Sequence, residues 1–150
     1  MKVIYTAVMA RLKEQVPSLW VDLDDGVIDK AGGDRPAVSF PAALVSIDLP
    51  NCKDVADDGE HQVCKARVIV RIAQNPLASR TSSEAKAGIR ESALERYDLI
   101  EEIIAALQGW GTEHFNSLSR VKQAKENRTD GLFVYGVEFE SAFYDFLESE

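Results

Sequence analysis

The residues with the most reactive side chains in this sequence are two cysteines and two histidines. Cys52, His61 and Cys64 fall within thirteen residues, and thiolate and imidazole groups are ligands that zinc prefers. A structural zinc site needs four ligands, however, and the usual cysteine pairs two residues apart are absent, while His114 lies far along the chain. The spacing therefore favours two reduced thiols, with Cys64 as a small core residue of its strand.

Two acidic segments place carboxylates at spacings similar to those of a calcium-binding loop. Residues 22–26 read Asp-Leu-Asp-Asp-Gly, but an EF-hand loop requires glycine at the sixth position and glutamate at the twelfth, where this chain has Gly33. Residues 54–59 depart from the pattern as well. Both segments are interpreted as solvated turns. A metal-dependent hydrolase would need an ion at the aspartates of the second segment or at the cysteine and histidine group.

Catalytic signatures are missing from the chain. There is no Gly-x-Ser-x-Gly elbow, no P-loop and no dinucleotide-binding fingerprint. Adjacent carboxylates occur at residues 57–58 and 101–102, in a loop and on the polar side of a helix, where charge usually serves solvation. The sequence predicts a protein that is not an enzyme and needs no cofactor.

Composition and charge narrow the class of partner. The 150 residues predict a single domain over residues 1–150, with residues 145–150 frayed, and 45% hydrophobic content suffices for a core. The net charge is -8, with 17 basic against 25 acidic residues, which disfavours binding to nucleic acid or to anionic lipid. No segment approaches the roughly 20 apolar residues of a membrane span, so we expect a cytoplasmic protein with no membrane partner.

Hydrophobic periodicity predicts the elements. Residues 2–15 carry apolar side chains at helical spacing, and residues 61–74 alternate apolar and polar side chains as a half-buried strand does. Shorter strands are expected at residues 19–23 and 42–49, the latter ended by Pro50 and Asn51. The last third reads as strands 118–125 and 132–143 joined by a turn at residues 127–131, which contains Asp-Gly.

A second helix is predicted from about residue 83 to residue 108, with a capping box at residues 81–84 and Gly109 as the C-terminal cap. Its expected buried stripe consists of Ile89, Ala93, Tyr97, Ile100, Ile104 and Leu107. Leu94 and Ile103 lie beside this stripe. The fold class is therefore α+β in the order α-β-β-β-α-β-β, a mostly antiparallel sheet with one buried and one polar face and two helices packed against it.

Because the sequence shows no catalytic or metal-binding motif, the surface residues are the remaining candidates for a functional site. The polar side of strand 61–74 and the basic hairpin near residue 128 are candidate contacts with other subunits or partners, since opposite charges steer association. Tyr135 joins them because aromatic residues are enriched at interfaces, and so do three aspartates of the second acidic loop. The full candidate set is Lys65, Arg67, Ile69, Arg71, Lys122, Lys125, Arg128, Tyr135, Asp54, Asp57 and Asp58.

Several segments together carry a family resemblance. They are residues 35–38 (Arg-Pro-Ala-Val), 41–45 (Pro-Ala-Ala-Leu-Val), 65–72 (Lys-Ala-Arg-Val-Ile-Val-Arg-Ile), 97–110 (from Tyr97 to Trp110) and 131–139 (from Gly131 to Phe139). Their order after an N-terminal helix resembles the Mu-like phage tail proteins and, more broadly, the phage tail terminators or tail completion proteins. The likeness extends over about residues 2–143, and residues 97–110 are its most specific part.

The resemblance implies a structural role in the virion tail, with assembly in the bacterial host cytoplasm. Proteins of this family form a ring, usually a hexamer, on the head-proximal end of the tail tube, where they stop polymerisation and offer a surface to head, neck or sheath proteins. DNA would pass through the lumen without specific binding. Two alternatives stay open: another head-tail joining or neck protein, and a small-ligand or peptide-binding α+β module with an apolar pocket.

Overall fold

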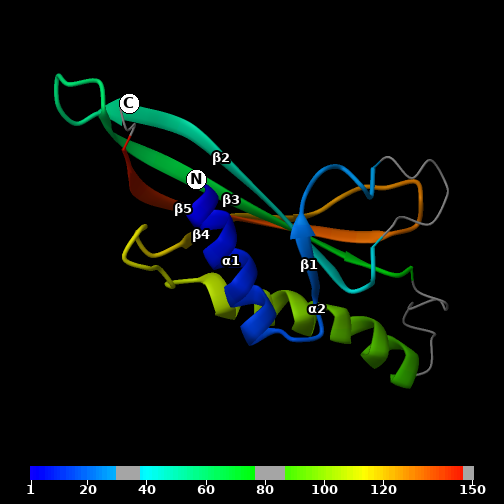
Figure 1. Ribbon diagram of the computed structural model, residues 1–150. Helices are drawn as coiled ribbons and strands as arrows, with labels where there is room; N and C mark the ends of the chain where they lie inside the picture. Colours follow the sequence, from blue (N-terminus) through cyan, green and yellow to red (C-terminus); the bar gives the residue numbers. More distant parts are fainter. Residues whose placement is uncertain (30–37, 77–86, 147–150) are drawn as a thin grey trace.

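The computed structural model describes residues 1–29, 38–76 and 87–146. In this part of the chain two helices accompany a five-stranded sheet (Figure 1). The elements are α1 (Lys2–Gln15), β1 (Trp20–Leu23), β2 (Ala42–Asp54), β3 (His61–Gln74), α2 (Ala87–Leu107), β4 (Ser119–Lys125) and β5 (Phe133–Phe146). The predicted α+β class and the predicted element order are confirmed.

The strands lie in the order β1-β2-β3-β5-β4. β1 pairs with β2 in parallel, and every other pairing is antiparallel. The central pairing of β3 with β5 runs from His61 opposite Phe146 to Gln74 opposite Phe133. The sheet is thus mostly antiparallel, as predicted, with β1 and β4 as its edges.

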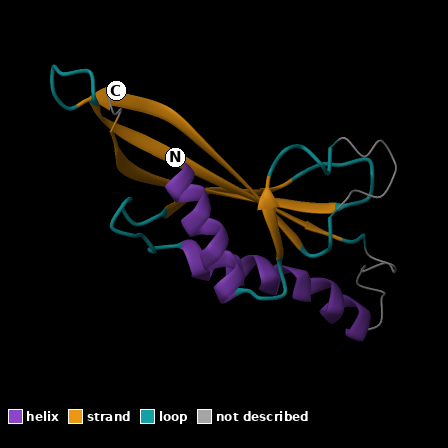
Figure 2. Ribbon diagram, in the orientation of Figure 1, coloured by secondary structure: helices purple, strands orange, loops and turns teal. Residues whose placement is uncertain are grey.

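Both helices cover the same face of the sheet (Figure 2). The alternation predicted for β3 is confirmed, because Cys64, Ala66, Val68, Val70 and Ile72 are all fully buried on that face. α1 adds Ile4, Val8 and Leu12, spaced by one helical turn. Together with the inner side chains of β5 these residues form the main core.

The buried stripe of α2 differs from the prediction. Ala93, Ile100, Ile103 and Leu107 are buried, whereas 38% of Ile89 and 39% of Tyr97 remain exposed. The buried positions follow steps of seven, three and four residues, so the stripe passes through Ile103 instead of Ile104. The predicted stripe is wrong because large apolar side chains lie on two neighbouring faces of α2, and only one of these faces is buried.

The sequence predicts a polar outer face of the sheet, but this face is apolar at one end. At one end a second, smaller core forms from Ile28, Ala42, Leu44, Ala73 and Val134. Ile28 belongs to the segment that follows β1, and its side chain is 1% exposed. This segment therefore packs on the outer face, opposite the helices, and the sheet is buried on both sides there.

β2 is longer than predicted. It continues through Pro50 and Asn51 to Asp54, with a register shift against β3 between Asp48 and Asn51. Proline is tolerated in strands at bulges and edges, and β1 pairs with β2 only as far as Val45. The predicted end of this strand at Pro50 and Asn51 is therefore wrong. The acidic turn is confined to residues 55–60, at the tip of a β2–β3 hairpin that projects away from the helices (Figure 1).

The remaining boundaries agree with the prediction or lie outside the described residues. Gly109 and Gly131 have φ angles of 75° and 81°, the left-handed conformation that favours glycine at a helix end and in a turn. β5 reaches Phe146, beyond the expected strand end at residue 143. The predicted capping box at residues 81–84 lies outside the described residues. In the described part of the chain, neither helix has the length and apolar character needed to cross a membrane.

Candidate interaction surfaces

Charged side chains form a ladder across the outer face of β3, β5 and β4. Arg67 contacts Glu140 at 2.6 Å and Glu138 at 3.8 Å, Lys65 lies 3.7 Å from Glu140, and Lys122 lies 3.7 Å from Glu138. The hydrogen bond from Arg67 lowers the pKa of Glu140. Three of the predicted contact residues thus share one surface, on which their charges are largely balanced by two glutamates.

Ile69 occupies the same outer face as this ladder. It lies opposite Glu138 in the β3–β5 register, and its side chain is partly buried. An apolar side chain among paired charges fits either a simple sheet surface or a subunit contact.

Arg71 and Arg128 form a separate ion-pair network beyond the end of this ladder. Arg71 binds Asp29, Asp24 and Glu126, and Arg128 binds Asp29, Glu126 and Asp130. The hydrogen bond from Arg71 lowers the pKa of Asp29 to about 2, against the opposing effect of burial. The side chains of Arg71 and Arg128 are 15% and 12% exposed. Most of their donor capacity is therefore used to hold the segment after β1 against the β4–β5 turn.

The carboxylate partners in this network were not singled out from the sequence. Asp29 is 42 residues from Arg71 along the chain, and Glu126 is 55 residues away. Only the strand order brings these segments together. No local spacing carries that information.

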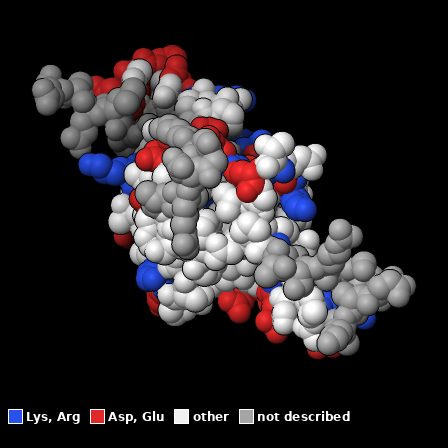
Figure 3. All heavy atoms as spheres, turned by 90° about the vertical axis from the view of Figure 1, so that its right-hand side faces the viewer, with Lys and Arg blue, Asp and Glu red and all other residues white. Residues whose placement is uncertain are grey.

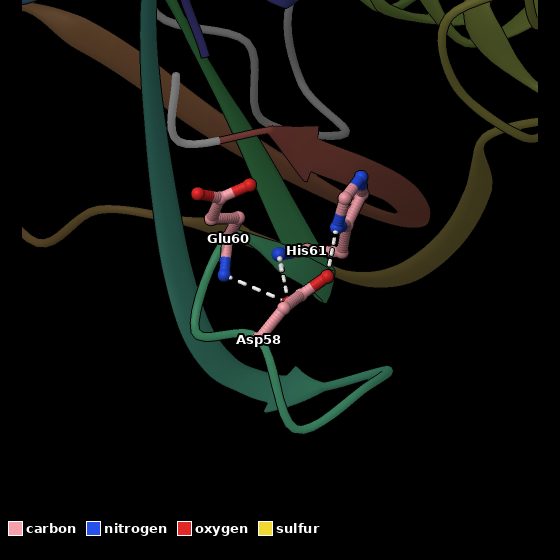
Figure 4. Close-up of side chains that lie close together, drawn as sticks. All are labelled: Asp58, Glu60 and His61. Atoms are coloured by element: carbon pink, nitrogen blue, oxygen red, sulfur yellow. Dashed lines mark hydrogen bonds and ion pairs between the residues drawn. The ribbon is translucent and has the colours of Figure 1, made fainter. Parts of the chain in front are cut away.

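The tip of the β2–β3 hairpin gathers Asp58, Glu60 and His61 (Figure 4). Asp58 Oδ1 accepts hydrogen bonds from the backbone N–H groups of Glu60 and His61, and its Oδ2 lies 2.6 Å from His61 Nδ1. The backbone hydrogen bond from Glu60 and the contact with His61 lower the pKa of Asp58. These contacts shape a turn, and Asp58 is exposed to solvent.

The other aspartates of this turn are exposed too. Asp54 Oδ1 accepts a hydrogen bond from Gln62 Nε2 at 3.0 Å, and Asp57 lies nearby at the tip. Asp54, Asp57 and Asp58 are therefore available on a projecting part of the molecule, as a contact surface requires.

The two cysteines lie directly opposite each other on β2 and β3. Cys52 is exposed and Cys64 is fully buried. Among the residues that the structure describes, the close group of three metal-type ligands is the one at the hairpin tip, and it includes neither cysteine. Cys52 and Cys64 therefore do not join His61 in a close group of ligands.

Aromatic side chains connect α2 with β5. The ring of Tyr97 meets the rings of Phe133 and Tyr135 edge-on, at centroid distances of 5.6 Å and 6.3 Å. The hydroxyl group of Tyr135 accepts a hydrogen bond from Gln123, and the ammonium group of Lys125 lies 5.6 Å from the Phe133 ring centre. Tyr135 and Lys125 thus sit at the border between the core and the surface of β4.

Acidic side chains also follow the outer face of α2, a feature that sequence reasoning did not single out as a site. Glu91, Glu95, Asp98 and Glu102 are all exposed, and their spacing of four, three and four residues places them on one face. In Figure 3 acidic groups gather at the height of the hairpin tip and again along the lower border, at the height of α2. The spacing was the signal by which this stripe could have been found.

A hollow lies between the start of β2, the end of β3 and α2. Its lining is Phe40, Pro41, Gln74, Asn75, Ser92, Glu95 and Arg96. Most of these side chains are polar, and Arg96 is engaged by the Asn75 carbonyl oxygen and the Phe133 ring. The hollow lacks the apolar lining expected of a small-ligand pocket.

Comparisons by sequence find no match, whereas the comparison with solved structures finds a similar fold. No protein-family model matches the sequence, and no curated protein is similar to it in sequence. Among solved structures, the fold is similar to that of a chain from the virion of a native gene transfer agent particle, with a TM-score of 0.51. The match covers 94% of each chain at 10% sequence identity, so it supports the fold alone.

Proposed function

We propose that this chain is a structural protein of a phage tail that forms a ring on the head-proximal end of the tail tube. The ring ends tube polymerisation and offers the surface to which head or neck proteins bind. The observation that carries the proposal is the agreement of the whole fold with that of a virion chain, over 94% of both proteins. The resemblance to tail terminators rests on sequence segments and is independent of that agreement.

The surface chemistry supports an assembly role. The described part of the chain offers a charged ladder, exposed turns and an exposed edge strand, while the hollow beside α2 is lined mostly by polar side chains and the cysteines and histidines of this part form no catalytic arrangement. Contacts between unlike surfaces of identical subunits produce a closed ring when the rotation per subunit closes. A hexamer requires a rotation of about 60° per subunit.

The net charge of -8 suits a ring through which DNA passes. An acidic surface repels phosphate groups and so disfavours the electrostatic binding on which most nucleic-acid affinity depends. The projecting β2–β3 hairpin, with Asp54, Asp57 and Asp58 near its tip, is a candidate for contact with the tube, sheath or neck.

The first experiment determines the mass of the purified protein by native mass spectrometry, followed by negative-stain imaging of large species. A hexamer with a central hole supports the proposal. A strict monomer at high concentration that forms no ring after addition of tail tubes overturns it. Rings that bind only portal or neck components would indicate that the chain is another kind of head-tail joining protein.

A further inference from the structure

The outer face of α2 combines negative charge with one exposed apolar side chain. Leu94 is 56% exposed, and it lies three residues after Glu91 and four residues before Asp98, the spacings that place side chains side by side on a helix. The ion pairs formed among the described residues include none with the four acidic side chains of this stripe. Arg90, also exposed, lies one turn before Leu94, so the face holds Leu94, four carboxylates without an ion-pair partner among the described residues and one guanidinium group at its start.

Edge strand β4 carries positive charge, which is opposite to the charge on the outer face of α2. All seven residues of Ser119–Lys125 are exposed, and the strand contains Arg120, Lys122 and Lys125 but no acidic residue. β4 pairs with β5 alone and is an outer edge of the sheet. Between two of its basic residues lies Val121, which is 46% exposed, at a shift in the register with β5. Lys122 lies 3.7 Å from Glu138, whereas the ion pairs among the described residues include none with Arg120 or Lys125. The strand therefore holds Val121 beside two cations that lack an acidic partner in this part of the chain.

We propose that the occupant of the β4 surface is a second copy of this chain, which docks the outer face of its α2 there. This inference rests on the proposed ring and assigns its subunit contact. Leu94 of one copy packs against Val121 of the next, and the carboxylates of α2 surround the contact opposite Arg120, Lys122 and Lys125. An apolar centre within a polar rim is the usual anatomy of a protein interface.

The charges disfavour a symmetric dimer in which one surface meets its own copy. In a twofold dimer built on either surface alone, each patch faces its own copy, so α2 carboxylates would meet carboxylates or β4 cations would meet cations. Like charges across an interface disfavour association. Contact between the two different surfaces brings opposite charges together and leaves one free α2 surface at one end of the assembly and one free β4 surface at the other, so addition continues until a ring closes.

The test uses two variants of the full chain, each altered on one surface. The first carries Arg120→Glu and Lys122→Glu, which makes both surfaces acidic, and the second carries Glu91→Lys, Glu95→Lys and Asp98→Lys, which makes both basic. A matched control carries Lys2→Glu, Gln15→Glu and Ser18→Glu, three exposed residues outside both surfaces and outside the β2–β3 hairpin, with the same net change of charge as the first variant. Circular dichroism and thermal unfolding establish that all three fold.

Assembly is then measured by native mass spectrometry under the conditions in which the unaltered protein forms rings, with tail tubes present if they are required. Each surface variant alone is expected to lose at least about tenfold in ring population, because like charges face each other in every contact, while the control keeps its rings. A mixture of the two variants restores rings, in which the two masses alternate and therefore occur in equal numbers.

The outcomes separate this contact from the function on which it rests. Rings formed by each variant alone, or a mixture that stays monomeric, overturn the pairing of α2 with β4 and leave the tail-terminator role intact. An unaltered protein that forms no ring even on tail tubes overturns the role and the contact together. Rings that appear only in the mixture, with a one-to-one ratio of the two masses, establish the contact.

Discussion

Arg71 and Asp29 form a two-pronged ion pair, in which Arg71 Nη1 donates to Asp29 Oδ2 at 2.9 Å and Nη2 donates to Oδ1 at 3.1 Å. The pair joins the central strand β3 to the segment that follows the edge strand β1. Glu126, just after β4, completes the link by accepting from Arg71 Nε and Nη2. One guanidinium group therefore ties together three parts of the chain that are distant in sequence.

Replacement of Arg71 by methionine is expected to destabilise the fold by about 2 kcal/mol, because partly buried carboxylates lose their charged partner. Urea unfolding followed by circular dichroism measures the change. Arg90→Met is the control, since Arg90 is exposed on α2, and its effect should stay within about 0.5 kcal/mol. Equal effects of the two substitutions would contradict the role assigned to the network.

The free energy of unfolding should decrease as the pH is lowered through a range set by the pKa of Asp29. The pKa of Asp29 is about 2 in the folded protein against an ordinary value of 3.8, so its contribution is present above pH 4 and is lost as pH falls towards 2. Because the Asp29 side chain is 48% exposed, solvent screening limits the contribution to about 1 kcal/mol. Urea unfolding at a series of pH values should show a shallower loss below pH 4 for Asp29→Asn. An unchanged slope would count against the ion pair.

Two substitutions on α2 should separate its buried and exposed faces. Ile103 is fully buried and Leu94 is 56% exposed. Ile103→Ala is expected to cost about 3 kcal/mol through lost packing and a cavity, whereas Leu94→Ala should change stability by less than about 0.5 kcal/mol. Denaturant titration of both variants at low protein concentration provides the comparison. A large loss in Leu94→Ala would mean that this face is buried within the monomer.

The hydroxyl group of Tyr5 should stabilise the edge of β2. It accepts a hydrogen bond of 2.9 Å from the backbone N–H of Ile47, beyond the point where β1 ends. Tyr5→Phe is expected to cost about 1 kcal/mol, because this N–H loses its partner. Tyr144, which is 66% exposed, supplies the control Tyr144→Phe. A Tyr5→Phe protein as stable as the unaltered chain would show that water replaces the hydroxyl.

Local pattern was enough to predict most elements of the fold. In β3 the alternation of Cys64, Ala66 and Val68 with Lys65 and Arg67 reports burial on one side, because side chains of a strand point to opposite faces in turn. Helix α1 was equally clear from Ile4, Val8 and Leu12. These elements each bury one regular face, so sequence spacing alone identifies the buried residues.

Features that depend on distant segments could not be predicted in this way. The burial of Ile28 against Leu44 and Val134 depends on the segment after β1 crossing the outer face of the sheet. The predicted strand ends at Pro50 because proline usually interrupts a strand. In the structure the register shift between Asp48 and Asn51 accommodates this proline. Arg71 and Arg128 were predicted as partner contacts from their charge, but their carboxylate partners become visible only once the strand order is known.

The central claim is that the chain caps one end of a tail tube, and electron microscopy of purified tubes mixed with the protein tests it most directly. The account predicts a single ring of copies at one end of each tube and no further growth at that end when tube subunits are added. Tubes with bare ends that continue to grow, or protein bound along their sides, would contradict it.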